Sequence, residues 1–338
     1  MSTVLKILCD LNGTSGNEAA VRDYILEQIK PYCTTCTVDA MGSVIAFKKG
    51  KRTPEKRVML SAHMDEVGFI ITGATEEGYL QFAPVGGINP SVVLGRRLAL
   101  ENGGFGMVGT VPIHLLHEDA GEKVPSFDEL LIDVGAADKQ TAETMAPVGS
   151  FAYFSESYIA FGDGKICAKA LDDRIGCMLM IQLIQSELEA DTWFCFQVQE
   201  EVGLRGAACT GSRVQPDRVL VLEATTAADL DGVTGDKRVC ALGDGPVVSF
   251  MDGATIYDRA LYRMARETAD ENGIPSQTKT AIAGGNDAGA LQRAGQGSAA
   301  LAVSLPCRYI HSGASVVQQS DIDATCALLA ALLPKLYD

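Results

Sequence analysis

The chain has 338 residues, 47% of them hydrophobic, and carries a formal net charge of −15 at pH 7. This is enough apolar material for one large domain or two smaller ones. An acidic surface repels nucleic-acid phosphates and anionic lipids, which argues against DNA, RNA or membrane partners. No apolar run approaches the roughly 20 residues of a transmembrane helix, and the N-terminus lacks the basic and apolar regions of a signal peptide. We therefore expect a cytoplasmic protein.

Ten cysteines do not by themselves indicate a disulfide framework in a chain of this kind. Most lie among apolar neighbours, where a free thiol behaves as a small hydrophobe. Cys33 and Cys36 form a Cys-x-x-Cys pair, but a zinc ribbon needs a second such pair, which the sequence lacks. We expect neither a redox nor a metal-binding role for this pair.

The first part of the chain predicts a helix, a hairpin and a buried strand. Ser15 and Glu18 have the spacing of a capping box, and apolar residues recur at helical spacing in the segment 19–29 that follows. Segment 37–49 is typical of a β-hairpin, with a glycine in its turn. Residues 57–62, RVMLSA, form a short apolar run that predicts a buried strand.

A different pattern covers residues 69–163, which are rich in Gly and Val and show helical periodicity only around 138–145. Its short alternating runs predict a β-rich insert. Beyond it, helices and strands alternate, which predicts an α/β sheet with helices on both faces. The expected helices are 173–188, 255–272 and 321–336, and the expected strands are 193–199, 218–222 and 298–305.

Carboxylate and imidazole side chains from five segments follow predicted strands or open a predicted helix. Ligands of open α/β sheets bind outside the carboxyl ends of the strands, so we expect these side chains to meet at one edge of the sheet. Two of the chain's four histidines are among them. The set consists of His63, Asp65, Asp172, Asp173, Glu200, Glu201, Glu223 and His311.

So many acids at one edge predict bound cations. Each feature alone is weak, because paired acids usually face water or occupy the first turn of a helix. Arg174 and Arg205 are the nearest cations in the sequence, and they are too few to neutralise the set. Two histidines with several carboxylates suit zinc, cobalt or manganese, and the lack of cysteine argues against structural zinc. Carboxylates left over after ligation predict a hydrolytic site with an activated water and a glutamate as general base.

Five motifs resemble those of a known family. SAHMDEVGF, KALDDRIG, QEEVGLRGA, GGNDAGA and RYIHS stand in the order and spacing of the tetrahedral aminopeptidases, also labelled glutamyl or deblocking aminopeptidases and sometimes endoglucanases. The resemblance runs from the first helix to the last and includes the insert. It implies a catalytic α/β/α sandwich with a mixed central sheet, formed by residues 1–68 and 164–338. A smaller β-barrel-like (PDZ-like) insert domain, residues 69–163, interrupts it.

The resemblance also implies the ligands of two divalent metal ions in each subunit. His63 and Glu223 are the implied ligands of the first ion, and Glu201 and His311 are those of the second. Asp172 is expected to bridge both ions. Zinc is the first expectation for the metal, with cobalt or manganese as alternatives.

Other side chains around the implied metals have expected roles in catalysis. Asp65 is expected to hydrogen-bond the ring nitrogen of His63 that does not face the metal. Glu200 is expected to take a proton from the bridging water and pass it to the leaving amine. Asp173 and Arg205 are expected either to support ligand geometry or to form ordinary salt bridges.

Two positions depart from the family's usual pattern. Glu223 stands where the family usually has an aspartate ligand, and related two-metal peptidases outside the family use glutamate there, so we still expect it to be a ligand. Asn286 stands where the family usually has threonine before Asp287. His114 and His117, in the insert, have a spacing that could suit a metal, but no carboxylates accompany them, so we expect structural or surface roles.

The implied function is removal of N-terminal residues from peptides. The implied assembly is a homo-oligomer built from dimers, with twelve subunits in a hollow tetrahedral particle whose dimer contacts come from the insert. A deacylase or carboxypeptidase on the same metals remains an alternative, and it should show a cationic pocket for a substrate carboxylate. A glycosidase normally needs two carboxylates that flank the sugar and no pair of metal ions, so its site would not explain His63 and His311. A shell-forming binding protein without activity is a second alternative, and it would fail to bind two metals per chain.

Overall fold

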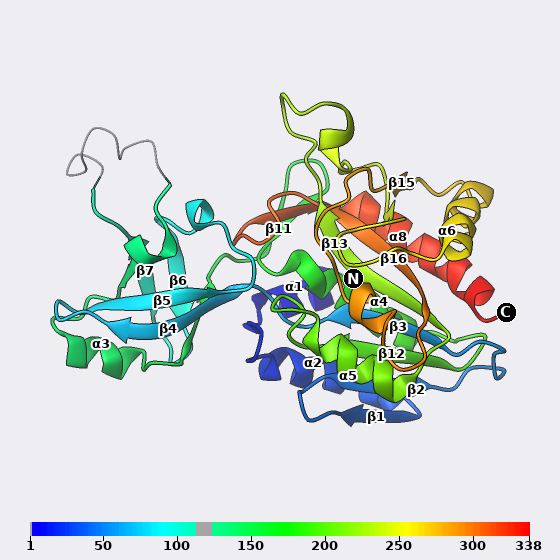
Figure 1. Ribbon diagram of the computed structural model, residues 1–338, viewed down its shortest axis with the longest axis horizontal. Helices are drawn as coiled ribbons and strands as arrows, with labels where there is room; N and C mark the ends of the chain where they lie inside the picture. Colours follow the sequence, from blue (N-terminus) through cyan, green and yellow to red (C-terminus); the bar gives the residue numbers. More distant parts are fainter. Residues whose placement is uncertain (1, 113–123) are drawn as a thin grey trace. The chain divides into compact units, whose positions relative to one another are not determined.

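The computed structural model describes residues 2–112 and 124–338. The chain forms two compact units, each with its own core (Figure 1). The first unit contains a mixed eight-stranded sheet, and the second contains a closed six-stranded barrel, which confirms the predicted fold class. The predicted domain boundaries stay a prediction. The first unit consists of Met1–Asp65, Ser157–Ile310 and Ala314–Asp338, and the second of Glu66–Glu156 and His311–Gly313.

The sheet of the first unit has four parallel strands at its centre and antiparallel partners on both sides. The carboxyl ends of the parallel strands therefore meet at one edge, where ligands of such sheets bind. In spatial order the strands are β1 (Thr35–Val38), β2 (Val44–Lys48), β12 (Thr192–Gln197), β3 (Val58–His63), β13 (Arg218–Thr226), β16 (Ala299–Cys307), β14 (Val247–Val248) and β15 (Gln277–Thr278).

Helices cover both faces of this sheet because alternate strand residues point to opposite sides. In β3, Val58 and Leu60 belong to the larger core cluster, while Met59 belongs to the cluster on the other side. The larger cluster includes α1 (Ser2–Asp10), α2 (Ala19–Ile29), α4 (Leu171–Gln185), α6 (Arg259–Glu271) and α8 (Gln319–Leu332). The other cluster includes α5 (Arg205–Val214) and α7 (Ala288–Leu291).

The barrel of the second unit is filled by aromatic and aliphatic side chains. Phe69 packs edge-on against Phe82 and Phe154, with ring centroids 5.4 and 5.2 Å apart. The barrel confirms the predicted β-rich insert, and its one α-helix in the described residues, α3 (Lys139–Met145), falls where helical periodicity was found. Around the barrel the strands are β4 (Gly68–Ala74), β5 (Tyr79–Val85), β8 (Leu131–Asp133), β7 (Phe105–Gly109), β6 (Arg97–Leu100) and β9 (Phe151–Phe154).

Smaller elements complete the described residues. No helix in the described residues is both long enough and apolar enough to cross a bilayer. None of the ten cysteines, all of which lie in the described residues, forms a disulfide. A three-stranded sheet consists of β10 (Ile159–Phe161), β11 (Lys165–Ala168) and β17 (Ser315–Gln318). The short 3₁₀ helices are η1 (Lys30–Tyr32), η2 (Pro90–Val92), η5 (Phe127–Glu129), η6 (Gly235–Arg238) and η7 (Leu333–Leu336).

Three predicted features differ from the structure. β13 continues to Thr226, so Glu223 lies within this strand rather than after it. The helix expected from residue 255 begins at Arg259, because the carboxylate of Asp258 accepts the backbone N–H groups of residues 260 and 261 and caps it there. The capping box expected at Ser15 is wrong, since no side chain caps α2 and the Ser15 hydroxyl bonds elsewhere.

Candidate metal centre

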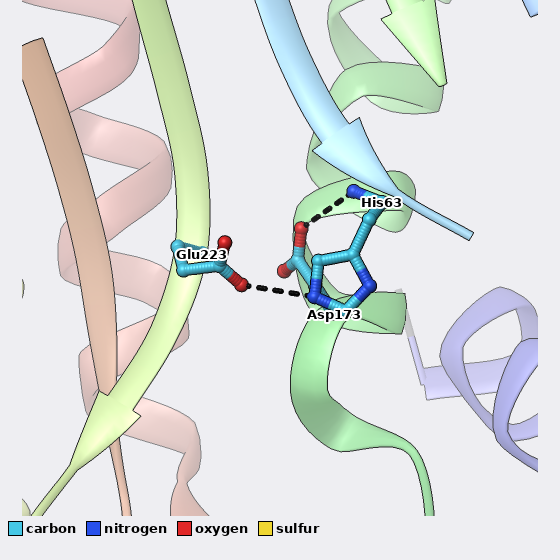
Figure 2. A group of neighbouring side chains, drawn as sticks. All are labelled: His63, Asp173 and Glu223. Carbon is cyan, nitrogen blue, oxygen red and sulfur yellow. Dashed lines mark hydrogen bonds and ion pairs between the residues drawn. The ribbon is translucent and has the colours of Figure 1, made fainter. Parts of the chain in front are cut away.

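His63 lies at the centre of the candidate site. It is the last residue of β3 and is buried. Its Nε2 atom is 3.2 Å from Oε1 of Glu223, in the neighbouring strand β13, and 3.4 Å from Oδ1 of Asp172, at the start of α4. Figure 2 shows the imidazole facing Glu223, with Asp173 beside it. Parallel pairing of β3 with β13 thus brings together residues 160 positions apart in the sequence.

Two groups of side chains in the described residues have the spacing of metal ligands, and the ligand atoms of each group lie within 4.8 Å of one another. One group is His63, Asp173 and Glu223, and the other is His63, Asp172 and Glu201. Four of the five predicted ligands are therefore neighbours. Imidazole with several carboxylates is a donor set that suits zinc, cobalt or manganese.

Asp173 holds the backbone around the site. Its Oδ2 accepts the backbone N–H of His63 at 3.2 Å, and its Oδ1 accepts that of Gly176 at 2.9 Å. A Cβ on Gly176 would lie 2.4 Å from the Asp173 carboxylate, so only glycine fits there. Because both oxygens already accept hydrogen bonds, Asp173 is suited to fixing the end of β3 and the start of α4. Asp172 belongs to the group with Glu201, and its Oδ1 is 3.4 Å from Nε2 of His63.

Asp65 organises the turn that carries the two adjacent glutamates. Its carboxylate accepts the backbone N–H groups of Glu200 at 3.0 Å and Glu201 at 3.1 Å, and the hydroxyl of Ser15 at 2.6 Å. The ring Nδ1 of His63 is 3.0 Å from the main-chain oxygen of Asp65 and 3.6 Å from its Oδ1. The contact expected from the Asp65 side chain to this ring is thus made mainly by the Asp65 main chain.

Glu200 and Glu201 follow β12 in a tight turn. The backbone N–H groups of Gly203 and Leu204 both donate to the carbonyl of Glu200, at 2.9 Å each. Gln199, just before, has a φ of 56°, in the left-handed region that costs a non-glycine residue about 1–2 kcal/mol. Glu200 is largely buried, with 9% of its surface exposed.

Burial controls the electrostatics of this site. It raises the pKa of Glu200 and of Glu223 well above the ordinary value, despite the opposing charge of His63. Burial lowers the pKa of His63, but the charge of Glu223 and the contact with Asp172 outweigh it and hold this pKa well above the usual value. The site therefore favours bound protons or bound cations over bare carboxylates.

His311 belongs to the second unit in the structure. Its Nδ1 is 2.8 Å from the carbonyl oxygen of Gly87, and its backbone φ of 58° is left-handed. The contact with Gly87 fixes one ring nitrogen, and the role of His311 as a metal ligand stays a prediction. His114 and His117 lie outside the described residues.

Asp287 is a residue near the site to which sequence reasoning gave no role. It is 1% exposed, and neither carboxylate oxygen has a hydrogen-bond partner in the described residues. Its charge acts on Glu200 and raises the pKa of that side chain further. The sequence signal was an aspartate directly before the small apolar residues of α7, within the motif GGNDAGA.

A buried carboxylate oxygen without a hydrogen-bond partner indicates whether a divalent cation fits this site. Oε2 of Glu223 is buried and has no hydrogen-bond partner in the described part of the chain. Burying a carboxylate oxygen in this way is costly unless a cation or a hydrogen bond compensates it. A divalent ion would supply that compensation. His63 and Glu223 lie in one group of possible ligands, and Asp172 lies 3.4 Å from the same ring nitrogen of His63, so the residues present fit such an ion.

An imidazole and clustered carboxylates at the carboxyl edge of a mixed sheet define the centre of a metal-dependent hydrolase. Residues 42–328 match the M42 glutamyl aminopeptidase family, and the chain belongs to this family. The chain is 32% identical over 343 residues to the lysyl aminopeptidase of Pyrococcus furiosus, covering 98% of this chain and 96% of the relative. It is 30% identical over 344 residues to the glutamyl aminopeptidase of Lactococcus lactis subsp. cremoris, covering 98% and 95%.

A solved structure agrees with this membership. The TET1 peptidase of Pyrococcus horikoshii has a TM-score of 0.86 and 34% sequence identity to this chain, with 98% of each chain covered. The resemblance found in the sequence motifs is thereby confirmed. The chain is an aminopeptidase, an enzyme that hydrolyses peptide bonds, and its family uses divalent metal ions.

Proposed function

We propose that this aminopeptidase acts through two metal ions and a glutamate base. His63 and Glu223 would hold the first ion, and Glu201 and His311 would hold the second. Asp172 would be a ligand that the two ions share. The observation that carries the proposal is the convergence of four side chains from the end of β3, the start of α4, the turn after β12 and the interior of β13. Ligand atoms of His63, Asp172 and Glu201 lie within 4.8 Å of one another, and Oε1 of Glu223 is 3.2 Å from Nε2 of His63.

Glu200 is the proposed general base. Bound divalent ions polarise a carbonyl group and make a water molecule acidic near neutral pH. Glu200 takes the proton from this water as it attacks the scissile carbonyl, and then delivers the proton to the leaving amine. Asp65 holds Glu200 in place through the backbone of the turn. Burial of Glu200 raises its pKa, which suits a group that must both accept and release a proton.

The proposed substrates are peptides with a free N-terminus. The relatives named above differ in the N-terminal residue in their names, lysyl in one and glutamyl in the other, so family membership leaves the preferred residue open. A deacylase or carboxypeptidase on the same centre is the alternative. We propose zinc as the metal, because imidazole and carboxylates are its usual ligands in catalytic sites.

We also propose that the chain assembles into a homo-oligomer through the β-rich insert at 69–163, between the catalytic segments 1–68 and 164–338. The Pyrococcus horikoshii TET1 peptidase can assemble into a tetrahedron or a large octahedral shell. A tetrahedral particle of twelve chains, built from dimers, is the expected form. Light scattering of the purified protein tests this, and a monomer in solution would contradict it.

The function is tested with a panel of aminoacyl-p-nitroanilides and enzyme reloaded with zinc, cobalt or manganese. We expect metal-dependent release of p-nitroaniline that falls by about 10²–10⁴-fold in Glu200→Gln, since that substitution removes the base. Glu271→Gln, on the exposed face of α6, is the matched control and should keep full activity. N-acetylated substrates should not be cleaved. Cleavage of blocked substrates, or full activity in Glu200→Gln, would refute the proposal.

A further inference from the structure

The turn that carries Glu200 and Glu201 is held from the N-terminal part of the chain. Oε1 of Glu18 accepts the backbone N–H of Gln199 at 3.1 Å, and the hydroxyl of Ser15 donates to Oδ2 of Asp65 at 2.6 Å. These contacts span 181 and 50 residues of sequence. Both side chains are buried, with Ser15 5% and Glu18 6% exposed.

The backbone at Gln199 needs such a contact. Its φ of 56° is left-handed, a conformation that a non-glycine residue keeps only when its surroundings over-determine it. Glu18 bonds the N–H of Gln199, and the carbonyl of Gln199 accepts the N–H of Arg205 at 3.1 Å. Fixing both sides of this residue fixes the direction in which the next two side chains leave the strand.

Asp65 receives the second contact of this arrangement. Its two oxygens accept the N–H groups of Glu200 and Glu201, and its Oδ2 also accepts the Ser15 hydroxyl. The hydroxyl therefore sets the plane of the carboxylate that both N–H groups must meet. Glu18 thus bonds the backbone of Gln199 directly, while Ser15 reaches the backbone of Glu200 and Glu201 through Asp65.

The turn around Ser15 and Glu18 has hydrogen bonds of its own, and the segment just before it is anchored to the core. The N–H of Asn17 donates to the carbonyl of Thr14 at 2.7 Å, and that of Gly16 donates to Oε1 of Glu18 at 2.8 Å. Fully buried Arg174 donates to the carbonyls of Leu8, Leu11 and Met64, which ties the end of α1 to the end of β3. The contacts to the Glu200 turn therefore come from a fixed frame.

Helix capping does not account for these two side chains. Neither one caps α2, and Glu18 is a carboxylate buried beside an already acidic centre, where burial raises its pKa. A carboxylate forms stronger hydrogen bonds to backbone N–H groups than a neutral acceptor does. The carboxylate of Glu18 is such an acceptor, and it bonds Gln199, the residue directly before Glu200.

We propose that Ser15 and Glu18 are positioning residues of the peptidase reaction, which together hold the Gln199–Glu201 turn so that Glu200 reaches the attacking water and Glu201 reaches a metal ion. This inference rests on the proposed function. Neither residue contacts substrate in this role. Their effect on the rate passes through the turn.

The test compares Glu18→Leu, Glu18→Gln and Ser15→Ala in the full-length enzyme. Displacing a catalytic group by about 1 Å can cost about 100-fold in rate, so kcat of Glu18→Leu should fall by about 100-fold with little change in KM. Glu18→Gln keeps an acceptor oxygen and should recover most of kcat. The kcat of Ser15→Ala should fall by about 10-fold, less than that of Glu18→Leu, because this substitution removes only one hydroxyl.

Asp258→Ala is the matched control for lost stability. Its carboxylate also accepts two backbone N–H groups, but at the start of α6, so this variant should lower Tm and leave kcat unchanged. The visible absorption of the cobalt-loaded protein reports ligand geometry without turnover. It should change in Glu18→Leu and Ser15→Ala, and stay unchanged in Asp258→Ala.

Unchanged kcat and cobalt spectra in folded Glu18→Leu and Ser15→Ala would overturn the proposal. A loss of kcat in Asp258→Ala that matches its loss of Tm would do the same, because the effect would then be one of stability alone. If Glu18→Leu does not fold, kcat and the cobalt spectra of Ser15→Ala and Glu18→Gln test the positioning role in its place. A wild-type enzyme that cleaves no free-amine substrate would refute the proposed function instead, and the cobalt spectra would still decide on the positioning role.

Discussion

Glu223 stands at a position where the resemblance in sequence led us to expect aspartate. It lies inside β13, and its Oε1 is 3.2 Å from Nε2 of His63. Its second oxygen is buried without a hydrogen-bond partner in the described chain. The longer side chain therefore still presents an oxygen to the imidazole and keeps another for a cation.

Replacing Glu223 with glutamine tests its assignment as a ligand. The amide keeps the shape but removes the charge, so the affinity for the first metal ion should fall by at least about 10-fold. Competition with a chromophoric chelator measures this affinity. Glu271→Gln, whose exposed side chain pairs with Lys335, is the control. Equal affinity in Glu223→Gln and the wild type would remove Glu223 from the ligand set.

Sequence reasoning named candidate site residues that follow predicted strands or open a helix, and it gave Ser15 and Glu18 no role in the site. His63 and Glu201 could be found because an acid or a histidine directly after an apolar strand marks the ligand-binding edge of a sheet. Ser15 and Glu18 also stood out, but as a capping box. The local spacing is the same whether such side chains bond their own helix or a turn 181 residues away, so the sequence could not separate the two cases.

At the scale of elements, the loop that ends at His311 is tied to the loop after β13. Arg308 donates two hydrogen bonds to the carboxylate of Asp229, at 2.7 and 2.6 Å, and the Asp229 side chain is only 4% exposed. The backbone N–H of Leu242 donates to the same carboxylate at 3.1 Å. One carboxylate thus joins three loop segments that border the carboxyl edge of the sheet.

Asp229→Asn should lower the free energy of unfolding by about 1.5–3 kcal/mol at pH 7, because it weakens hydrogen bonds to a charged group. Burial raises the pKa of Asp229, but the hydrogen bonds from Arg308 outweigh it and hold this pKa below the ordinary value. The stabilisation is therefore present above the unfolded-state pKa of about 4 and is lost as pH falls through the lower folded-state value.

Urea unfolding at pH 7 and pH 3 measures this difference between the wild type and Asp229→Asn. The gap in stability should be clear at pH 7 and should shrink at pH 3. A gap of the same size at both pH values would show that the charge of Asp229 contributes nothing.

The type of most long elements could be predicted, while α5 and several boundaries could not. The apolar runs of β3, β12 and β16 predicted strands because the central strands are buried on both faces. α5 was missed because its sequence, RGAACTGSRV, contains two glycines and only one large apolar residue. It is helical because Ala207 and Val214 pack into the core beneath the sheet.

At the scale of the whole molecule, the acidic centre should make stability depend on metal. Carboxylates that are buried without cations raise the free energy of the folded chain. An ion that binds only the folded state stabilises it by about 2.7 kcal/mol at 100 times its Kd. Thermal unfolding of chelated and reloaded enzyme should therefore show a clearly lower Tm after chelation, which zinc restores. Equal Tm values would mean that these residues do not hold a metal ion tightly.

A sheet with helices on both faces and a separate β-rich insert were both predictable from the change in periodicity along the chain. Assembly was not predictable from periodicity, because it depends on how surfaces of separate copies fit together. The expected assembly came only from the family resemblance, and it is a proposal supported by the Pyrococcus horikoshii relative.

The number of divalent ions needed to restore activity tests the two-metal account most directly. Chelated enzyme is titrated with zinc or cobalt while release of p-nitroaniline and metal content per chain are followed. We predict that full activity returns only when two ions are bound per chain. Full activity with one ion per chain, or activity that persists with none, would contradict the account.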